Sequence, residues 1–289
     1  VGAGQMPADQ ALALAFKFKD SPDRQVFSAA SQIAASVDRS VPSELQPNYA
    51  RFMRAMYSER ARALGVEPKA GENDDARLLR VELAYMAARY GDPEMRDGVK
   101  RLALKWLEDR RSIDPNMAGP ALQAAAQNGD RAYYERLVAE LKKASDRRDR
   151  AKIVDAIGSF RDAAIAKDAL QLLLDPSIDV RDVSGLLYAF NDEAETEGVA
   201  WPFLIANYEK LLARLPNRLG THAGSELPVA GAGFCDDKGY RQVESFFAER
   251  VKTMPGAERN LAKVLESIRL CEPSRTAQRP GVTKFLQAW

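Results

Sequence analysis

The residue types that bind metals and activate nucleophiles are scarce in this sequence. Among its 289 residues there is one histidine, His222, and there are two cysteines, Cys235 and Cys271. A catalytic zinc ion usually takes three protein ligands, commonly with two histidines among them. A sequence with one histidine cannot contain the HExxH motif of zinc peptidases. We therefore expect no catalytic metal site in this chain.

Nucleophilic catalysis has little support either. His222 is the only possible base of a Ser-His-Asp triad, and the glycines around it favour a surface loop. Cys235 and Cys271 are too far apart in sequence for a zinc knuckle or a CxxC redox pair. They could form one disulfide in an oxidising compartment or remain free, and the sequence leaves both possibilities open.

Two acidic pairs resemble parts of the metal-binding motifs of all-α terpene synthases. Asp74-Asp75 lacks the further acid that the first motif requires, because Leu78 stands in its place. Asn191-Asp192 lacks the Ser/Thr and Glu that would complete the second motif. We expect Asp74 or Asp75 to cap a helix instead.

A basic run is the one candidate contact for nucleic acid. It comprises Lys142, Lys143, Arg147, Arg148, Arg150 and Lys152. Asp146 and Asp149 interrupt it, and the whole chain has 42 Lys and Arg against 41 Asp and Glu. Nucleic-acid binding needs a continuous basic footprint. We therefore expect a solvated turn between helices and no nucleic-acid partner.

Apolar residues recur at helical spacing along almost the whole chain. The clearest stripe comprises Trp201, Leu204, Ile205, Tyr208, Leu211, Leu212 and Leu215. This spacing places the apolar side chains on one face of a helix, so we expect Trp201 to anchor the core. We find no sustained period-two alternation, no apolar run of the ~18 residues that span a bilayer, and no signal-peptide pattern at the start. We expect an all-α protein with no membrane partner.

Turn residues fall between the apolar stripes. They include Gly91-Asp92-Pro93, Asp114-Pro115, Gly129-Asp130, Asp175-Pro176-Ser177 and Pro255-Gly256. An Asp there can cap the next helix, and a Pro fits its first turn. Short links make successive helices antiparallel neighbours, and a series of such pairs curves into an armadillo-like or HEAT-like superhelix. We predict an irregular α-solenoid, with irregular stretches at Gly65 to Asp75 and Asn217 to Asp237.

Three motifs in a fixed order carry a resemblance. They are Leu64-Gly65-x-x-Pro68 followed by Gly71-Glu72 and Arg77-x-Leu79-Arg80; Ala156-Ile157-Gly158-x-x-Arg161-Asp162; and Trp201-x-Phe203-Leu204-x-x-Asn207. This order resembles the C-terminal helical domain of zinc aminopeptidases of the aminopeptidase N family, which include the endoplasmic-reticulum aminopeptidases. The resemblance covers about residues 8 to 270.

The resemblance implies a fold and a function. In that family the domain is a bowl of helices that covers the active site and encloses the peptide-substrate chamber. The parent enzymes remove residues from peptide N-termini with one zinc ion, which is held in an upstream domain. We therefore expect residues 1–289 to be one C-terminal domain without its own cofactor, whose partners are the peptide and the upstream catalytic domain. The alternative is a free-standing helical-repeat scaffold that binds another protein.

One site residue follows from the resemblance. The position that corresponds to Arg161 lies near the enclosed substrate space of the family, and a guanidinium binds a carboxylate through two parallel hydrogen bonds. We therefore expect Arg161 to contact the far end of a peptide. The alternative is an ordinary surface arginine, or one paired with Asp155 or Asp162.

Overall fold

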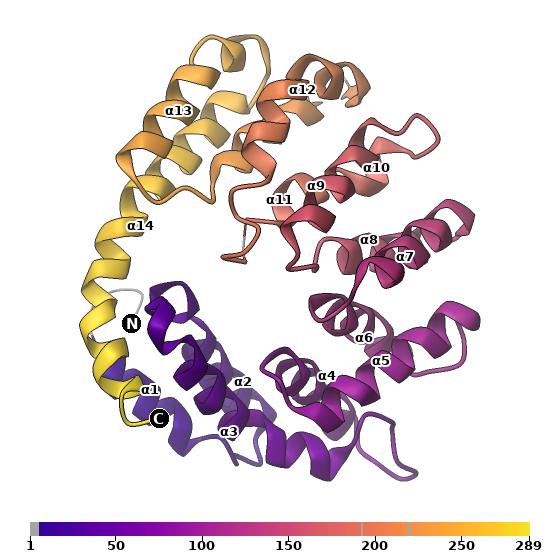
Figure 1. The fold of residues 1–289 in the computed structure, drawn as a ribbon, viewed down its shortest axis with the longest axis vertical. Helices are drawn as coiled ribbons and strands as arrows, with labels where there is room; N and C mark the ends of the chain where they lie inside the picture. Colours follow the sequence, from indigo (N-terminus) through magenta and orange to yellow (C-terminus); the bar gives the residue numbers. More distant parts are fainter. Residues whose placement is uncertain (1–5, 192, 219–220) are drawn as a thin grey trace. The chain divides into compact units, whose positions relative to one another are not determined.

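The computed structural model describes residues 6–191, 193–218 and 221–289, and these residues are almost entirely helical (Figure 1). The all-α class is therefore confirmed for this part of the chain. The chain divides into two compact units, Val1–Ala125 with Pro273–Trp289 (unit 1) and Ala126–Glu272 (unit 2). Helix α6 (Pro115–Gln127) and helix α14 (Ala257–Leu286) each begin in one unit and end in the other.

Unit 1 consists of consecutive helices that pack on one another. The strongest contacts join α1 to α2, α3 to α4, and α4 to α5. Its elements before α6 are α1 (Ala8–Lys17), α2 (Arg24–Ala35), η1 (Asp38–Ser40), η2 (Ser43–Leu45), α3 (Gln46–Leu64), α4 (Asp74–Arg89) and α5 (Pro93–Glu108).

Unit 2 has shorter elements, and α7 packs on α8. Its described elements up to α14 are α7 (Arg131–Lys143), α8 (Arg147–Ile157), α9 (Ala163–Gln171), η3 (Leu172–Leu174), α10 (Val180–Val183), α11 (Leu186–Ala189), α12 (Ala200–Arg214), β1 (Asn217–Arg218), β2 (Thr221–His222), η4 (Ala223–Gly231), α13 (Asp237–Phe247) and η5 (Arg250–Thr253).

Aspartates cap the helices at most of the predicted turns. Asp92, Asp114 and Asp130 each accept a hydrogen bond from a backbone N–H group in the first turn of the next helix. The prediction for Asp74 and Asp75 is wrong, because Asn73 caps α4 and its side chain accepts from the N–H of Ala76 at 2.8 Å. The two acids occupy the first turn, where the helix dipole favours negative charge.

The predicted irregular stretch from Asn217 to Asp237 is more ordered than expected. It contains the antiparallel pair β1–β2, with Asn217 opposite His222, and then the 3₁₀-helix η4. Strands of two residues are too short to produce a period-two pattern in the sequence. The side chain of His222, like residue Asp192, lies outside the described part of the chain.

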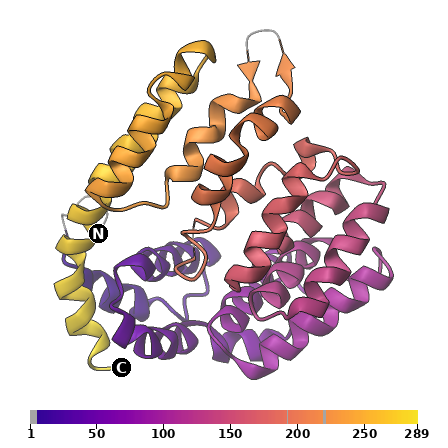
Figure 2. The ribbon, with the colours of Figure 1, turned by 45° about the horizontal axis from the view of Figure 1, so that its top comes forward.

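Cys235 and Cys271 form a disulfide, which decides a question that the sequence left open. Their Cα atoms are 5.2 Å apart, and the bond joins the segment before α13 to the first half of α14. Helix α13 and the first half of α14 lie side by side in unit 2 (Figure 2). Closing a loop of 36 residues restricts the unfolded chain and stabilises the fold by about 3–4 kcal/mol.

The second half of α14 packs against the start of the chain within unit 1, where the two segments lie side by side (Figure 1). Phe285 contacts Phe52 with ring centroids 5.1 Å apart, and Lys284 pairs with Asp9 at 2.8 Å. A Cβ on Gly281 would lie 3.0 Å from the backbone nitrogen of Asp9, so the two helices approach closely. The sequence pattern does not indicate this packing, because Pro273 and Pro280 interrupt the helical spacing.

Candidate functional site

Arg161 lies in a tightly held turn between α8 and α9. Before it, the buried ring of Phe160 packs on Tyr134, with centroids 5.8 Å apart. After it, Asp162 Oδ1 accepts hydrogen bonds from the N–H groups of Ala164 at 2.7 Å and Ile165 at 3.0 Å. These backbone donors lower the pKa of Asp162 below its ordinary value of 3.8. The turn is therefore anchored on both sides of Arg161.

The partner of Arg161 is Glu193. The Arg161 Nε donates to Glu193 Oε2 at 3.1 Å, and both side chains are partly buried. The alternative pairing with Asp155 or Asp162 is not found, since the ion pair that Arg161 forms within the described part of the chain is with Glu193. Glu193 stands 32 residues away on the segment after α11, so no local spacing rule points to it.

The pairing with Glu193 occupies only part of the Arg161 guanidinium. The bond to Glu193 uses Nε and leaves Nη1 and Nη2 without a hydrogen bond to the described residues. Those two nitrogens could bind a carboxylate. The negative charge of Glu193 would oppose that carboxylate, so the pair limits how strongly Arg161 attracts anions.

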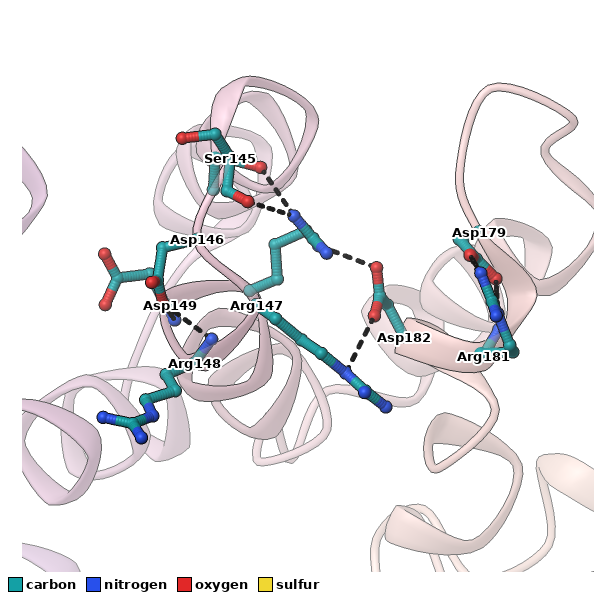
Figure 3. A network of polar contacts seen from close by, with 10 residues as sticks. Ser145, Asp146, Arg147, Arg148, Asp149, Asp179, Arg181 and Asp182 are labelled. Carbon is teal, nitrogen blue, oxygen red and sulfur yellow. Dashed lines mark hydrogen bonds and ion pairs between the residues drawn. The ribbon is translucent and has the colours of Figure 1, made fainter.

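The basic run spans the end of α7, the predicted turn and the start of α8, and nearby carboxylates match most of its charges (Figure 3). Arg150 Nε lies 2.7 Å from Asp182 Oδ2, and Lys142 Nζ lies 2.8 Å from Asp175 Oδ2. Arg147 also points toward Asp182, at 4.0 Å (Figure 3).

Residues of the first motif hold the loop between α3 and α4 through the side chain of Arg80, an arrangement that we call the Arg80 clip. The buried guanidinium of Arg80 pairs with Glu72 and lowers the pKa of that carboxyl. It also donates to the carbonyl oxygens of Glu67 at 3.2 Å and Leu64 at 3.4 Å. Gly65 ends α3 with φ of 72°, a conformation that glycine adopts without strain. The motif positions therefore hold the loop in place.

Residues of the second and third motifs also contribute to packing between helices. An ideal Cβ on Gly158 would lie 2.7 Å from the Cβ of Ala189, so glycine lets α8 and α11 approach. Trp201 is 5% exposed and packs against the rings of Phe234, Phe246 and Phe247. The prediction that Trp201 is a core residue is confirmed.

Residues 1–270 match the sequence profile of a family described as the ERAP1-like C-terminal domain. The chain belongs to this family. The resemblance read from the three motifs is thereby confirmed. In this ERAP1-like domain, Arg80, Gly158 and Trp201 serve the fold.

The relatives of this ERAP1-like domain are aminopeptidases. The chain is 23% identical to aminopeptidase M1-B of Oryza sativa subsp. japonica over 88% of its length, and 25% identical to aminopeptidase M1 of Arabidopsis thaliana over 93%. It is 24% identical to glutamyl aminopeptidase of Rattus norvegicus over 86%. The matched regions span 29%, 31% and 26% of those proteins. The ERAP1-like domain is thus similar to the C-terminal part of much longer aminopeptidases.

The described part of the ERAP1-like domain holds neither a metal-ligand group nor a membrane-spanning helix. Among residues 6–191, 193–218 and 221–289, no three His, Cys, Asp or Glu side chains are grouped so that they could hold a metal ion. Within the same ranges, no helix combines the length and the apolar character that crossing a membrane requires.

Proposed function

We propose that residues 1–289 act as one C-terminal accessory domain of a zinc aminopeptidase that removes residues from peptide N-termini. The observation that carries this proposal is the match to an ERAP1-like C-terminal domain over residues 1–270, together with the 26% to 31% of each cited relative that the chain spans. The proposed aminopeptidase activity is inferred from the names of those relatives. The zinc ion would be held by the upstream catalytic domain.

The accessory role proposed is to cover the active site and enclose the peptide-substrate chamber. Consecutive helices pack on one another within each unit, which supports an irregular solenoid curved into a bowl. A concave helical surface can surround an extended peptide. Closing such an enclosure excludes water and positions the substrate for the reaction.

Arg161 is the residue proposed to contact the peptide within this chamber. Its Nη1 and Nη2 would receive the C-terminal carboxylate, while Nε stays on Glu193. The anchored turn supports this role, because a fixed guanidinium loses less conformational freedom on binding than a mobile one.

The parent protein tests the proposal. We expect its reading frame to encode an HExxH upstream of this chain, and the purified protein to release N-terminal residues from peptides at a rate that depends on peptide length. The parent without residues 1–289 should retain zinc and lose that length dependence. A parent without HExxH, or without aminopeptidase activity, would overturn the proposal and favour a scaffold protein. If the length dependence survives the deletion, the proposed chamber role is refuted, and the assignment to an aminopeptidase still stands.

A further inference from the structure

Aromatic rings hold helices α12 and α13 of unit 2 together (Figure 1). Tyr208 on α12 contacts Phe246 and Phe247 on α13, with ring centroids 5.4 Å and 6.1 Å apart. Trp201, about two turns earlier on α12, contacts the same two rings at 5.7 Å and 6.1 Å. Trp201 and Phe247 are buried, so these contacts fix one helix against the other.

Two hollows on these helices adjoin at Gln242. The first measures about 480 Å³ and is lined by Gly198, Trp201, Pro202, Ile205, Ala206, Phe234 and Gln242. The second measures about 460 Å³ and is lined by Asp237, Lys238, Arg241, Gln242 and Ser245. We call the two hollows together the α12–α13 groove. Most of its lining comes from the first half of α12 and from α13.

The α12 wall of the groove is apolar. Its members recur at helical spacing and form one stripe of about two turns, which comprises Trp201, Pro202, Ile205 and Ala206. Trp201 is buried, whereas Ile205 is 45% exposed and Pro202 and Ala206 are also exposed. Exposed apolar residues that gather along a hollow indicate a surface that contacts another protein.

The α13 wall of the groove is polar and positively charged. Lys238, Arg241 and Ser245 recur at helical spacing along it. Within the described ranges, the side chains of Lys238 and Arg241 form no hydrogen bond and no ion pair. Asp237 lines the same hollow, so two cations share it with a single carboxylate. Exposed cations without a carboxylate partner attract anionic side chains of another molecule.

We infer that the α12–α13 groove binds an amphipathic helix of a partner protein that carries acidic residues on one flank. Both walls are helical stripes of about two turns, and a groove of this kind accepts a helix through apolar side chains at helical spacing. The apolar face of the partner helix contacts Ile205 on α12, and its Glu or Asp side chains pair with Lys238 and Arg241 on α13. A basic flank is disfavoured, because it would meet two cations. The inference goes beyond the proposed function, which assigns no partner to this groove, and does not depend on it.

A binding assay with designed peptides tests the inference on the chain of residues 1–289. The acidic probe is a fluorescein-labelled amphipathic peptide of about 14 residues, with Leu on its apolar face and Glu on the adjoining flank. A basic probe has Lys in place of every Glu, and a polar probe has Ser in place of every Leu. Fluorescence anisotropy measures the dissociation constant of each probe. We expect saturable binding of the acidic probe and at least about tenfold weaker binding of the other two.

Two variants and a matched control locate the binding. Ile205→Glu and Arg241→Glu should each weaken binding of the acidic probe at least about tenfold, because the first puts a charge in the apolar wall and the second reverses one in the basic wall. Lys210→Glu is the control, since it reverses a charge at an exposed position of α12 outside the groove, and it should change binding less than about twofold. All three positions are exposed, so the melting temperatures of the variants should match that of the unaltered chain.

The inference is overturned if the acidic probe does not bind saturably, if it binds no better than the basic probe, or if the control loses as much affinity as the two groove variants. Self-association of the unaltered chain that Ile205→Glu abolishes, measured by sedimentation, would assign the groove to a second copy and overturn it too. So would a parent enzyme that does not bind the acidic probe while the isolated chain does, because the groove would then be covered within the parent.

Discussion

Arg161 donates a hydrogen bond through Nε to Oε2 of Glu193, 3.1 Å away, across 32 residues of sequence. This pair holds the guanidinium in place and also sets its electrostatic field. A substrate carboxylate at Arg161 would meet the positive charge of the guanidinium and the negative charge of Glu193 together. The balance between those two charges can be changed by single substitutions.

The first prediction concerns the contact between Arg161 and a peptide carboxylate. In the parent enzyme, Arg161→Ala should raise KM about tenfold for a peptide with a free C-terminus, which corresponds to one charge-assisted hydrogen bond. The same peptide with an amidated C-terminus should be unaffected. Glu193→Gln should lower KM for the free acid, because it keeps an acceptor for Nε and removes the opposing charge. Equal effects of Arg161→Ala on both peptides would remove Arg161 from the site.

A second prediction concerns the clip formed by Arg80. Arg80→Ala should lower the free energy of unfolding by about 3 kcal/mol, because it leaves Glu72 and two backbone carbonyls without their donor. Arg77→Ala is the control on the same helix. Arg77 is partly exposed and pairs with Asp114 at 3.2 Å, so its loss should cost less than about 1 kcal/mol. Denaturant unfolding measures both values, and similar costs would show that the clip is not a structural element.

The third prediction concerns the packing of Trp201. Trp201→Ala should cost about 3–5 kcal/mol, because it empties a space lined by Phe234, Phe246 and Phe247. Ile205→Ala, one turn later on α12 and 45% exposed, should cost less than about 1 kcal/mol. Thermal melts of the two variants provide the comparison. A small shift for Trp201→Ala would contradict its place in the core.

The fourth prediction compares two glycines. Gly158→Ala should destabilise the chain by about 1–3 kcal/mol, because the new methyl group would lie 2.7 Å from the Cβ of Ala189. Gly185→Ala should be tolerated, since no atom lies within 4 Å of its Cβ position and its φ of −60° suits alanine. Equal stability of the two variants, measured by denaturant unfolding, would show that α8 and α11 can separate without cost.

A fifth prediction concerns acid stability. The Arg181 side chain and its backbone N–H lower the pKa of Asp179 from 3.8 to about 2. The folded chain therefore binds this proton more weakly than the unfolded chain, and the stabilisation is present above pH 4 and lost as the pH falls toward 2. Asp179→Asn removes this contribution and keeps an oxygen that can cap α10. The melting temperature of the variant should fall less steeply between pH 4 and pH 2, and parallel curves would refute the assignment.

Local periodicity predicted helix α12 and most of its buried face from the sequence alone. Trp201, Leu204 and Tyr208 recur at helical spacing and are all buried in α12. Asp92 and Asp130 precede helices and cap them as predicted, because a cap depends on residues only two or three positions away. The three motifs indicated the family because their order along the chain is itself a feature of the sequence.

Only the tertiary structure decided which distant residues meet. A pairing of Arg161 with Asp155 or Asp162 was one alternative from the sequence, and its partner in the structure is Glu193. The state of Cys235 and Cys271 became visible only when α13 and α14 were placed together. The contact of Phe285 with Phe52 likewise joins segments at opposite ends of the sequence. The physical reason is that helical spacing shows which face of a helix is buried but does not show which other helix covers it. That choice depends on how all the side chains of a unit pack at once.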